Sequence, residues 1–194
     1  MKRPRPLPFG IQGKIYLSPM AGLTDHPYRL IAKRFGVDVM VTEFASAKAL
    51  LLSIEKQEER IHFADEERPV GVQIFGADPA EMARAARLIE AGHAPDFIDI
   101  NFGCPARKIV EKNGGSGCLR DPVLLGEITA AVVEAVRLPV TAKMRIGWER
   151  FTPEETTLRL AGVIEGAGVS AIAVHGRPRG GGYSAKADWD RIAA

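Results

Sequence analysis

The chain has 194 residues, 46% of them apolar and 26% charged, as expected for a soluble globular protein with one sizeable core. Its formal net charge of +2 is too balanced to indicate a nucleic-acid-binding protein by itself. No apolar run approaches the roughly 20 residues that cross a bilayer, and no apolar segment follows the basic first residues. Two cysteines make no disulfide framework, and no metal-ligand spacing is present. We therefore expect a cytoplasmic protein with neither a membrane nor a metal partner.

Six short β-rich segments alternate with helical segments along the chain. The predicted strands are Ile15–Pro19, Asp38–Phe44, Val70–Phe75, Phe97–Asn101, Val140–Ile146 and Ala171–His175. The predicted helices are Asp25–Phe35, Ala47–Gln57, Asp78–Ala91, Asp121–Val136, Pro153–Glu165 and a segment that begins near Asp188. Several of these helices open on Asp with Pro in the first turn, and several end at Gly, the usual start and stop signals.

This βα alternation predicts a parallel sheet with right-handed crossovers. Two architectures fit the pattern, an open doubly wound sheet and a (β/α)₈ barrel. A barrel typically needs about 250 residues, so this chain would supply about six of its eight βα units.

Polar residues gather near the carboxyl ends of the predicted strands, where parallel α/β folds place their chemistry. Alternation along a strand predicts that Lys143 and Arg145 face the interior of a barrel, while Ala142 and Met144 face the helices. By the same alternation, Asp99 and Asn101 share one face of their strand. Ala173, His175 and Arg177 likewise share one face. Gln73 and Glu43 add polar groups near the ends of two further strands.

Lys143 and Cys104 are the strongest candidates for chemistry. A lysine inside an apolar strand is costly unless it is paired or contacts an anion. Cys104 lies between Gly103 and Pro105, past the end of a strand, where a reactive thiol is more plausible than a packing residue. Cys118, in a glycine-rich turn, is better explained by packing. No Gly-rich phosphate fingerprint is present, so a Rossmann nicotinamide site has no support.

With these residues assembled, the chain resembles the tRNA-dihydrouridine synthases, flavin enzymes built on a (β/α)₈ barrel. The central motif is DINFGCP at 99–105, followed by KNGGSGCLRDP at 112–122. The other matching segments are SPMAGLTDHPYR (18–29), VTEF (41–44), VQIFG (72–76), AKMRIGW (142–148) and HGR…YSAKADW (175–189).

The resemblance implies reduction of the 5,6 double bond of specific tRNA uridines by FMN, with NADPH as the reductant. Hydride would pass from reduced FMN to C6, and Cys104 would give a proton to C5 as the catalytic acid. The implied flavin contacts are Pro19, Met20, Ala21, Gln73, Lys143 and His175. The implied substrate contacts are Asn101, Arg145 and Arg177. Basic loops would hold the folded tRNA mostly by its shape.

By the same resemblance, residues 1–194 form an incomplete FMN-binding barrel domain, without the last two strands and a helical tRNA-binding domain. A six-strand piece is expected to expose strand edges and to retain FMN weakly. Two alternatives stay open. One is an FMN-barrel reductase of a free pyrimidine, similar to dihydroorotate dehydrogenase, and the other is a non-catalytic fragment.

Overall fold

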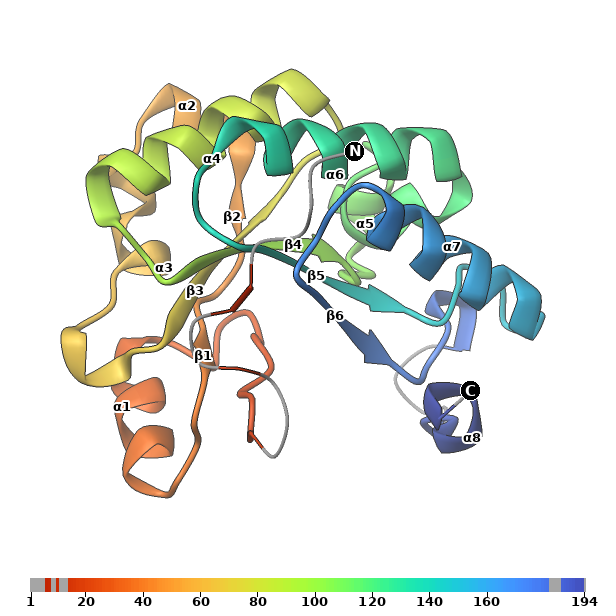
Figure 1. The fold of residues 1–194 in the computed structure, drawn as a ribbon, viewed down its shortest axis with the longest axis horizontal. Helices are drawn as coiled ribbons and strands as arrows, with labels where there is room; N and C mark the ends of the chain where they lie inside the picture. The colour runs from red at the N-terminus through yellow and green to blue at the C-terminus, as the bar shows by residue number, and fades with distance from the viewer. Residues whose placement is uncertain (1–5, 8–9, 11–13, 182–185, 194) are drawn as a thin grey trace.

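A computed structural model describes residues 6–7, 10, 14–181 and 186–193 of the chain. A six-stranded parallel sheet, in the order β1-β3-β4-β5-β6 with β2 also pairing with β3, forms its centre. The sheet is curled, and the long helices α4, α6 and α7 lie along one side of it (Figure 1). This is the predicted α/β class, in the form of part of a (β/α)₈ barrel.

The strands are β1 (Met40–Val41), β2 (Ala45–Ser46), β3 (Val70–Phe75), β4 (Phe97–Phe102), β5 (Val140–Arg145) and β6 (Ala171–His175). The α-helices are α1 (His26–Arg34), α2 (Ala47–Leu52), α3 (Glu58–Ile61), α4 (Pro79–His93), α5 (Arg107–Val110), α6 (Pro122–Ala135), α7 (Glu154–Gly166) and α8 (Trp189–Ala193). Four 3₁₀ segments are η1 (Glu55–Gln57), η2 (Asp65–Glu67), η3 (Gly115–Arg120) and η4 (Arg179–Gly181). Among the described residues, no helix is long and apolar enough to cross a membrane.

Aspartates begin the two longest helices, as their sequence predicts. The Asp78 carboxylate accepts a hydrogen bond from the Glu81 N–H, and that of Asp121 accepts from the N–H groups of Val123 and Leu124. Both aspartates precede a proline whose missing N–H costs nothing in the first turn of a helix.

The main core lies between the helices and the outer face of the sheet. Ala142 and Met144 are fully buried in this core, together with residues of α4, α6 and α7. Lys143 lies between them in sequence and lines a groove on the opposite face of the sheet. The predicted inward and outward positions of this strand are therefore confirmed.

The N-terminal part of the prediction is wrong in detail. Instead of a strand over 15–19, the described chain has one parallel bridge, between Tyr16 and Val39. Pro19 has no N–H to continue such a pairing. The predicted strand over 38–44 is reduced to Met40–Val41, and β2 follows it as a separate pair with β3.

Two further segments also differ from the prediction. The helix expected over 47–57 ends at Leu52, because Ser53 is extended, and η1 follows as a separate turn. The glycine-rich segment after Cys104, to which the sequence assigns no helix, contains α5 and η3.

Candidate functional site

Sheet register brings the polar side chains of the inner face into two adjacent rows. Gln73, Asp99 and Thr141 are direct neighbours across β3, β4 and β5. One step nearer the carboxyl ends, Asn101 pairs with Lys143, and Lys143 pairs with Ala173. Layers of this kind fill the interior of (β/α)₈ barrels.

Above these rows, Arg145 pairs with His175 at the ends of β5 and β6. The structure therefore brings together six of the predicted site residues on neighbouring strands: Gln73, Asn101, Lys143, Arg145, His175 and, just past β4, Cys104.

A chain of hydrogen bonds joins the inner-face residues. The Asp99 carboxylate accepts from Gln73 Nε2 and from Thr141 Oγ1, each at 2.5 Å. Gln73 Oε1 accepts from Asn101 Nδ2 at 2.7 Å. Burial raises the pKa of Asp99, while the bonds from Thr141 and Gln73 and the charge of Lys143 lower it.

The turn that carries Cys104 is fixed from three directions. Asn101 Oδ1 accepts from the backbone N–H groups of Gly103 and Cys104, at 3.0 and 2.8 Å. Arg145 Nε donates to the Gly103 carbonyl at 2.7 Å. Ser116 donates to the Cys104 carbonyl from both its hydroxyl and its N–H.

A glycine next to this turn allows the glycine-rich loop to approach it. Gly115 has φ +54°, and a Cβ there would lie 2.9 Å from the Cys104 carbonyl oxygen. A side chain at this position would push the loop away from the cysteine.

Cys104 is 9% exposed and has a free thiol. Burial raises its pKa, while the Ala106 N–H and the charge of Arg145 lower it. A thiol with a raised pKa keeps its proton at neutral pH, so it is suited to donate a proton rather than to attack as a thiolate. Cys118 is completely buried, with its pKa raised to about 12 by burial, which agrees with a packing role.

Lys143 lines a groove of about 260 Å³ on the inner face of the sheet. Pro19 and Asp99 also line it, and most of the remaining wall is apolar, including Tyr16, Val41, Phe97 and Ile172. Burial lowers the pKa of the Lys143 ammonium, and the carboxylate of Asp99 opposes that shift. A mostly apolar groove with a lysine at its wall fits a planar ring with a polar or anionic edge.

His175 lies where several positive charges meet. Burial lowers its pKa to about 4, and the charges of Arg145, Lys143 and Arg177 act in the same direction. The imidazole is therefore neutral near pH 7 and offers one donor and one acceptor. Arg177 is half-buried two residues further on, beyond the end of β6.

Pro19, Met20 and Ala21 lie on the loop before α1, where Met20 is 39% exposed. Thr24 Oγ1 accepts from the Met20 N–H, which closes the loop on itself. Glu43 Oε1 accepts from the N–H groups of Gly22 and Leu23, at 2.7 and 3.1 Å. The loop is thus attached to the segment between β1 and β2.

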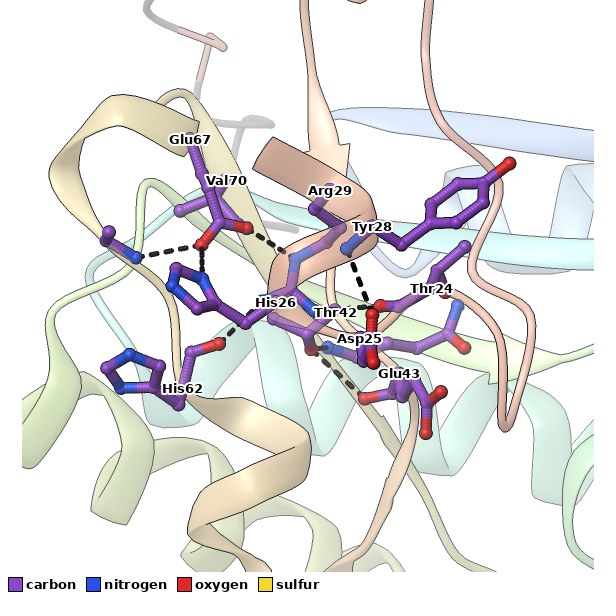
Figure 2. Close-up of polar contacts among 12 residues, drawn as sticks. Thr24, Asp25, His26, Tyr28, Arg29, Thr42, Glu43, His62, Glu67 and Val70 are labelled. Atoms are coloured by element: carbon purple, nitrogen blue, oxygen red, sulfur yellow. Dashed lines mark hydrogen bonds and ion pairs between the residues drawn. The ribbon is translucent and has the colours of Figure 1, made fainter. Parts of the chain in front are cut away.

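A buried ion pair supports the base of the same loop (Figure 2). Glu67 accepts from Arg29 Nε at 2.5 Å and contacts His26 Nδ1, and both Arg29 and Glu67 are completely buried. Arg29 also donates to the Thr24 and His62 carbonyls. The cluster Arg29–Glu67–His26 joins α1 to the segment before β3.

Sequence reasoning missed Thr141 and the buried pair of Glu67 and Arg29. Thr141 has the same strand parity as Lys143, a signal that was available. Glu67 belongs to the charged run DEER, which reads as solvated, and its burial depends on Arg29 far away in the sequence. Within the described residues, no group of His, Cys, Asp or Glu side chains could hold a metal ion.

Comparison with known proteins gives one consistent family. Residues 16–194 match the family model described as Dihydrouridine synthase (Dus). A tRNA-dihydrouridine synthase B of Pseudomonas aeruginosa is 43% identical over 96% of this chain and 55% of its own length. The tRNA-dihydrouridine synthase B of Pseudomonas putida is 44% identical over 96% of this chain and 54% of its own length. A probable tRNA-dihydrouridine synthase of Rickettsia conorii is 41% identical over 94% of this chain and 54% of its own length. The chain spans about half the length of the curated relatives it matches.

Proposed function

The chain belongs to the dihydrouridine synthase family, and from this premise we propose that it takes part in reducing uridines of tRNA to dihydrouridine. The observation that carries the proposal is the shared rim of Cys104 and Lys143. Asn101 pairs with Lys143 across β4 and β5, and the same Asn101 accepts hydrogen bonds from the turn of Cys104. The turn of Cys104 is therefore anchored to a direct neighbour of Lys143 at the carboxyl ends of β4 and β5.

We propose FMN as the cofactor of this site. Lys143 would hold the electron-rich edge of the ring, with Gln73 and His175 as neutral hydrogen-bonding groups and Pro19, Met20 and Ala21 against the ring face. The apolar walls of the groove and the lysine within them support this assignment. When bound, FMN would supply the hydride for C6 of the target uracil, with NADPH as the source of its electrons.

The residues of the chain would then complete the reaction. Cys104 would give its proton to C5, and its raised pKa agrees with this role as an acid. Asn101, Arg145 and Arg177 would contact the target base. That base must leave its stack to reach a site inside a barrel.

The proposed tRNA contacts lie on the loop after β4. Arg107, Lys108 and Lys112 are exposed there, although Arg107 Nε also donates to Glu111 at 2.6 Å. Exposed cations beside a catalytic turn fit phosphate groups of a folded RNA. Free thiols such as Cys104 and Cys118 are typical of proteins in a reducing compartment, where tRNA is also found. We therefore propose that the activity is cytoplasmic.

The test uses the purified chain supplied with FMN, NADPH and an unmodified tRNA transcript. Mass spectrometry of the digested tRNA measures dihydrouridine. We expect Cys104→Ala to retain the flavin absorbance and to lose about 10² to 10⁴ of the rate, the usual contribution of a general acid. Cys118→Ala is the matched control and should keep the wild-type rate.

Three outcomes would count against the proposal. Unchanged turnover in Cys104→Ala would remove the acid assignment. Reduction of a free pyrimidine in preference to tRNA would favour the other class of FMN reductase. Absence of flavin absorbance after incubation with FMN would leave a non-catalytic chain.

A further inference from the structure

Asp99 has no role in the proposed reaction, yet it is a buried carboxylate with both oxygens hydrogen-bonded on the inner face. It is 4% exposed, and its two carboxylate oxygens accept from residues on the strands at either side. A carboxylate buried in this way requires an explanation, because burial of a charge is costly unless its hydrogen bonds are used.

The bonds that begin at Asp99 all run in one direction. The Cys104 N–H donates to Asn101 Oδ1, Asn101 Nδ2 donates to Gln73 Oε1, and Gln73 Nε2 donates to Asp99 Oδ2. Every donor in this series points towards the carboxylate, so each bond polarises the next in the same sense.

The two ends of the series determine the orientation of both amides. Both carboxylate oxygens of Asp99 accept hydrogen bonds in the structure, and a backbone N–H can only donate. If Gln73 turned its oxygen towards Asp99, two acceptors would face each other. Asn101 would then have to turn its NH₂ group towards the N–H groups of Gly103 and Cys104.

We propose that Asp99 is a positioning residue, whose carboxylate fixes the amide of Gln73 and, through it, the amide of Asn101 that holds the Cys104 turn. Asp99 lines the groove beside Lys143, but it acts on the Cys104 turn only through two other side chains, Gln73 and Asn101. The importance of this relay for catalysis rests on the proposed role of Cys104, but the relay and its test do not.

Thr141 provides a matched control for the relay. Its hydroxyl donates to Asp99 Oδ1, the oxygen that Gln73 does not use, and so stands outside the series that joins Asp99, Gln73 and Asn101. Thr141→Val therefore removes one hydrogen bond from the same carboxylate and leaves the series from Asp99 to Cys104 complete.

The test is amide hydrogen exchange of the 194-residue chain without cofactor, measured by NMR. The rates of Gly103 and Cys104 are divided by those of Ile100 and Ala142, which are fully buried in the same sheet and report its general opening. We expect Asp99→Leu, which offers no acceptor, to raise this ratio about ten- to a hundredfold. Asp99→Asn, which keeps one oxygen but no charge, should raise it less, and Thr141→Val should leave it unchanged.

The relay itself can be tested in a variant that lacks the Gln73 amide. Gln73→Leu removes the link between Asp99 and Asn101, so adding Asp99→Asn should change the exchange ratio of Cys104 no further. If Asp99→Leu does not fold, Asp99→Asn and this double variant provide the comparison. The proposal is overturned if folded Asp99 variants keep the wild-type ratio, if Thr141→Val raises it equally, or if Asp99→Asn has its full effect without Gln73.

Discussion

Glu67 and Asp99 are both buried carboxylates, but their partners differ in kind. Glu67 accepts from the charged guanidinium of Arg29 and contacts His26, residues that belong to α1. Asp99 accepts from a neutral amide and a neutral hydroxyl on the adjacent strands, with the ammonium of Lys143 nearby. The first carboxylate joins distant pieces of chain, and the second orders side chains within one sheet face.

This difference separates the support of the fold from the support of the site. A carboxylate neutralised by a buried guanidinium stabilises whatever segments the two residues come from, and its loss affects the whole domain. A carboxylate satisfied by neutral donors fixes the direction of those donors, and its loss affects orientation more than stability. The predictions below test whether the two regions divide in this way.

The largest effect is expected from Arg29→Met. The change leaves Glu67 buried without its guanidinium, which costs about 3 to 5 kcal/mol in the free energy of unfolding. Urea denaturation followed by circular dichroism measures this loss. Arg34→Met, at an exposed position of the same helix, is the matched control and should change stability by less than about 0.5 kcal/mol.

A double variant sharpens this first prediction. Arg29→Met with Glu67→Met removes both charges and should recover most of the stability that the single change loses, since apolar replacement of a buried pair is often neutral. A double variant as unstable as the sum of the single changes would contradict the ion-pair interpretation.

A smaller and pH-dependent effect is expected at Asp99. Because burial raises the folded-state pKa, the carboxyl contributes stability below its unfolded pKa of about 3.9, and this contribution is lost as pH rises through the folded value. Each unit of the raised pKa is equivalent to about 1.4 kcal/mol. Asp99→Asn has no such loss, so it should gain stability relative to wild type between pH 4 and pH 7.5.

Thr141→Val should show the opposite pH dependence. The Thr141 hydroxyl lowers the pKa of Asp99, so its removal makes the ionised form less favourable. This variant should therefore lose more stability relative to wild type at pH 7.5 than at pH 4. Urea unfolding at both pH values measures the two differences, and equal differences would show that the Thr141 hydroxyl does not change the pKa of Asp99.

The sheet and the shared rim could be predicted because they depend on local periodicity. Alternation in VTAKMR predicts that Lys143 and Arg145 share one face, and parallel strands bring equivalent ends together. Asp78 and Asp121 likewise mark their helices by the residues that follow them. These signals need no knowledge of distant partners.

The remaining parts depend on contacts between distant segments. Glu67 and Arg29 are 38 residues apart, and neither residue type indicates burial. The contact from Thr141 to Asp99 spans 42 residues and depends on strand register, which periodicity alone does not fix. Tyr16 forms a single bridge with Val39 in place of a strand. The length of such a pairing depends on how far the partner segment runs beside it.

The smallest effect is expected at Glu43, which lies between the two regions. Its carboxylate accepts from Gly22 and Leu23 on the loop of Pro19, Met20 and Ala21, while Arg29 holds the base of that loop through the Thr24 carbonyl. Both amides belong to exposed residues, so water can replace part of what Glu43 provides. We expect Glu43→Ala to reduce the free energy of unfolding by less than about 1 kcal/mol.

Exchange of the Gly22 and Leu23 amides should nevertheless rise about two- to tenfold in Glu43→Ala, because one hydrogen bond to a carboxylate is lost. Glu43→Gln keeps an acceptor oxygen and should preserve most of the protection. Arg60→Met tests the remaining contact of Glu43, at 3.4 Å, and should have little effect because Arg60 is half exposed. If Glu43→Ala leaves both amides protected while Arg29→Met exposes them, the loop is held by the ion-pair cluster alone. The division between fold support and site support would then fail at this loop.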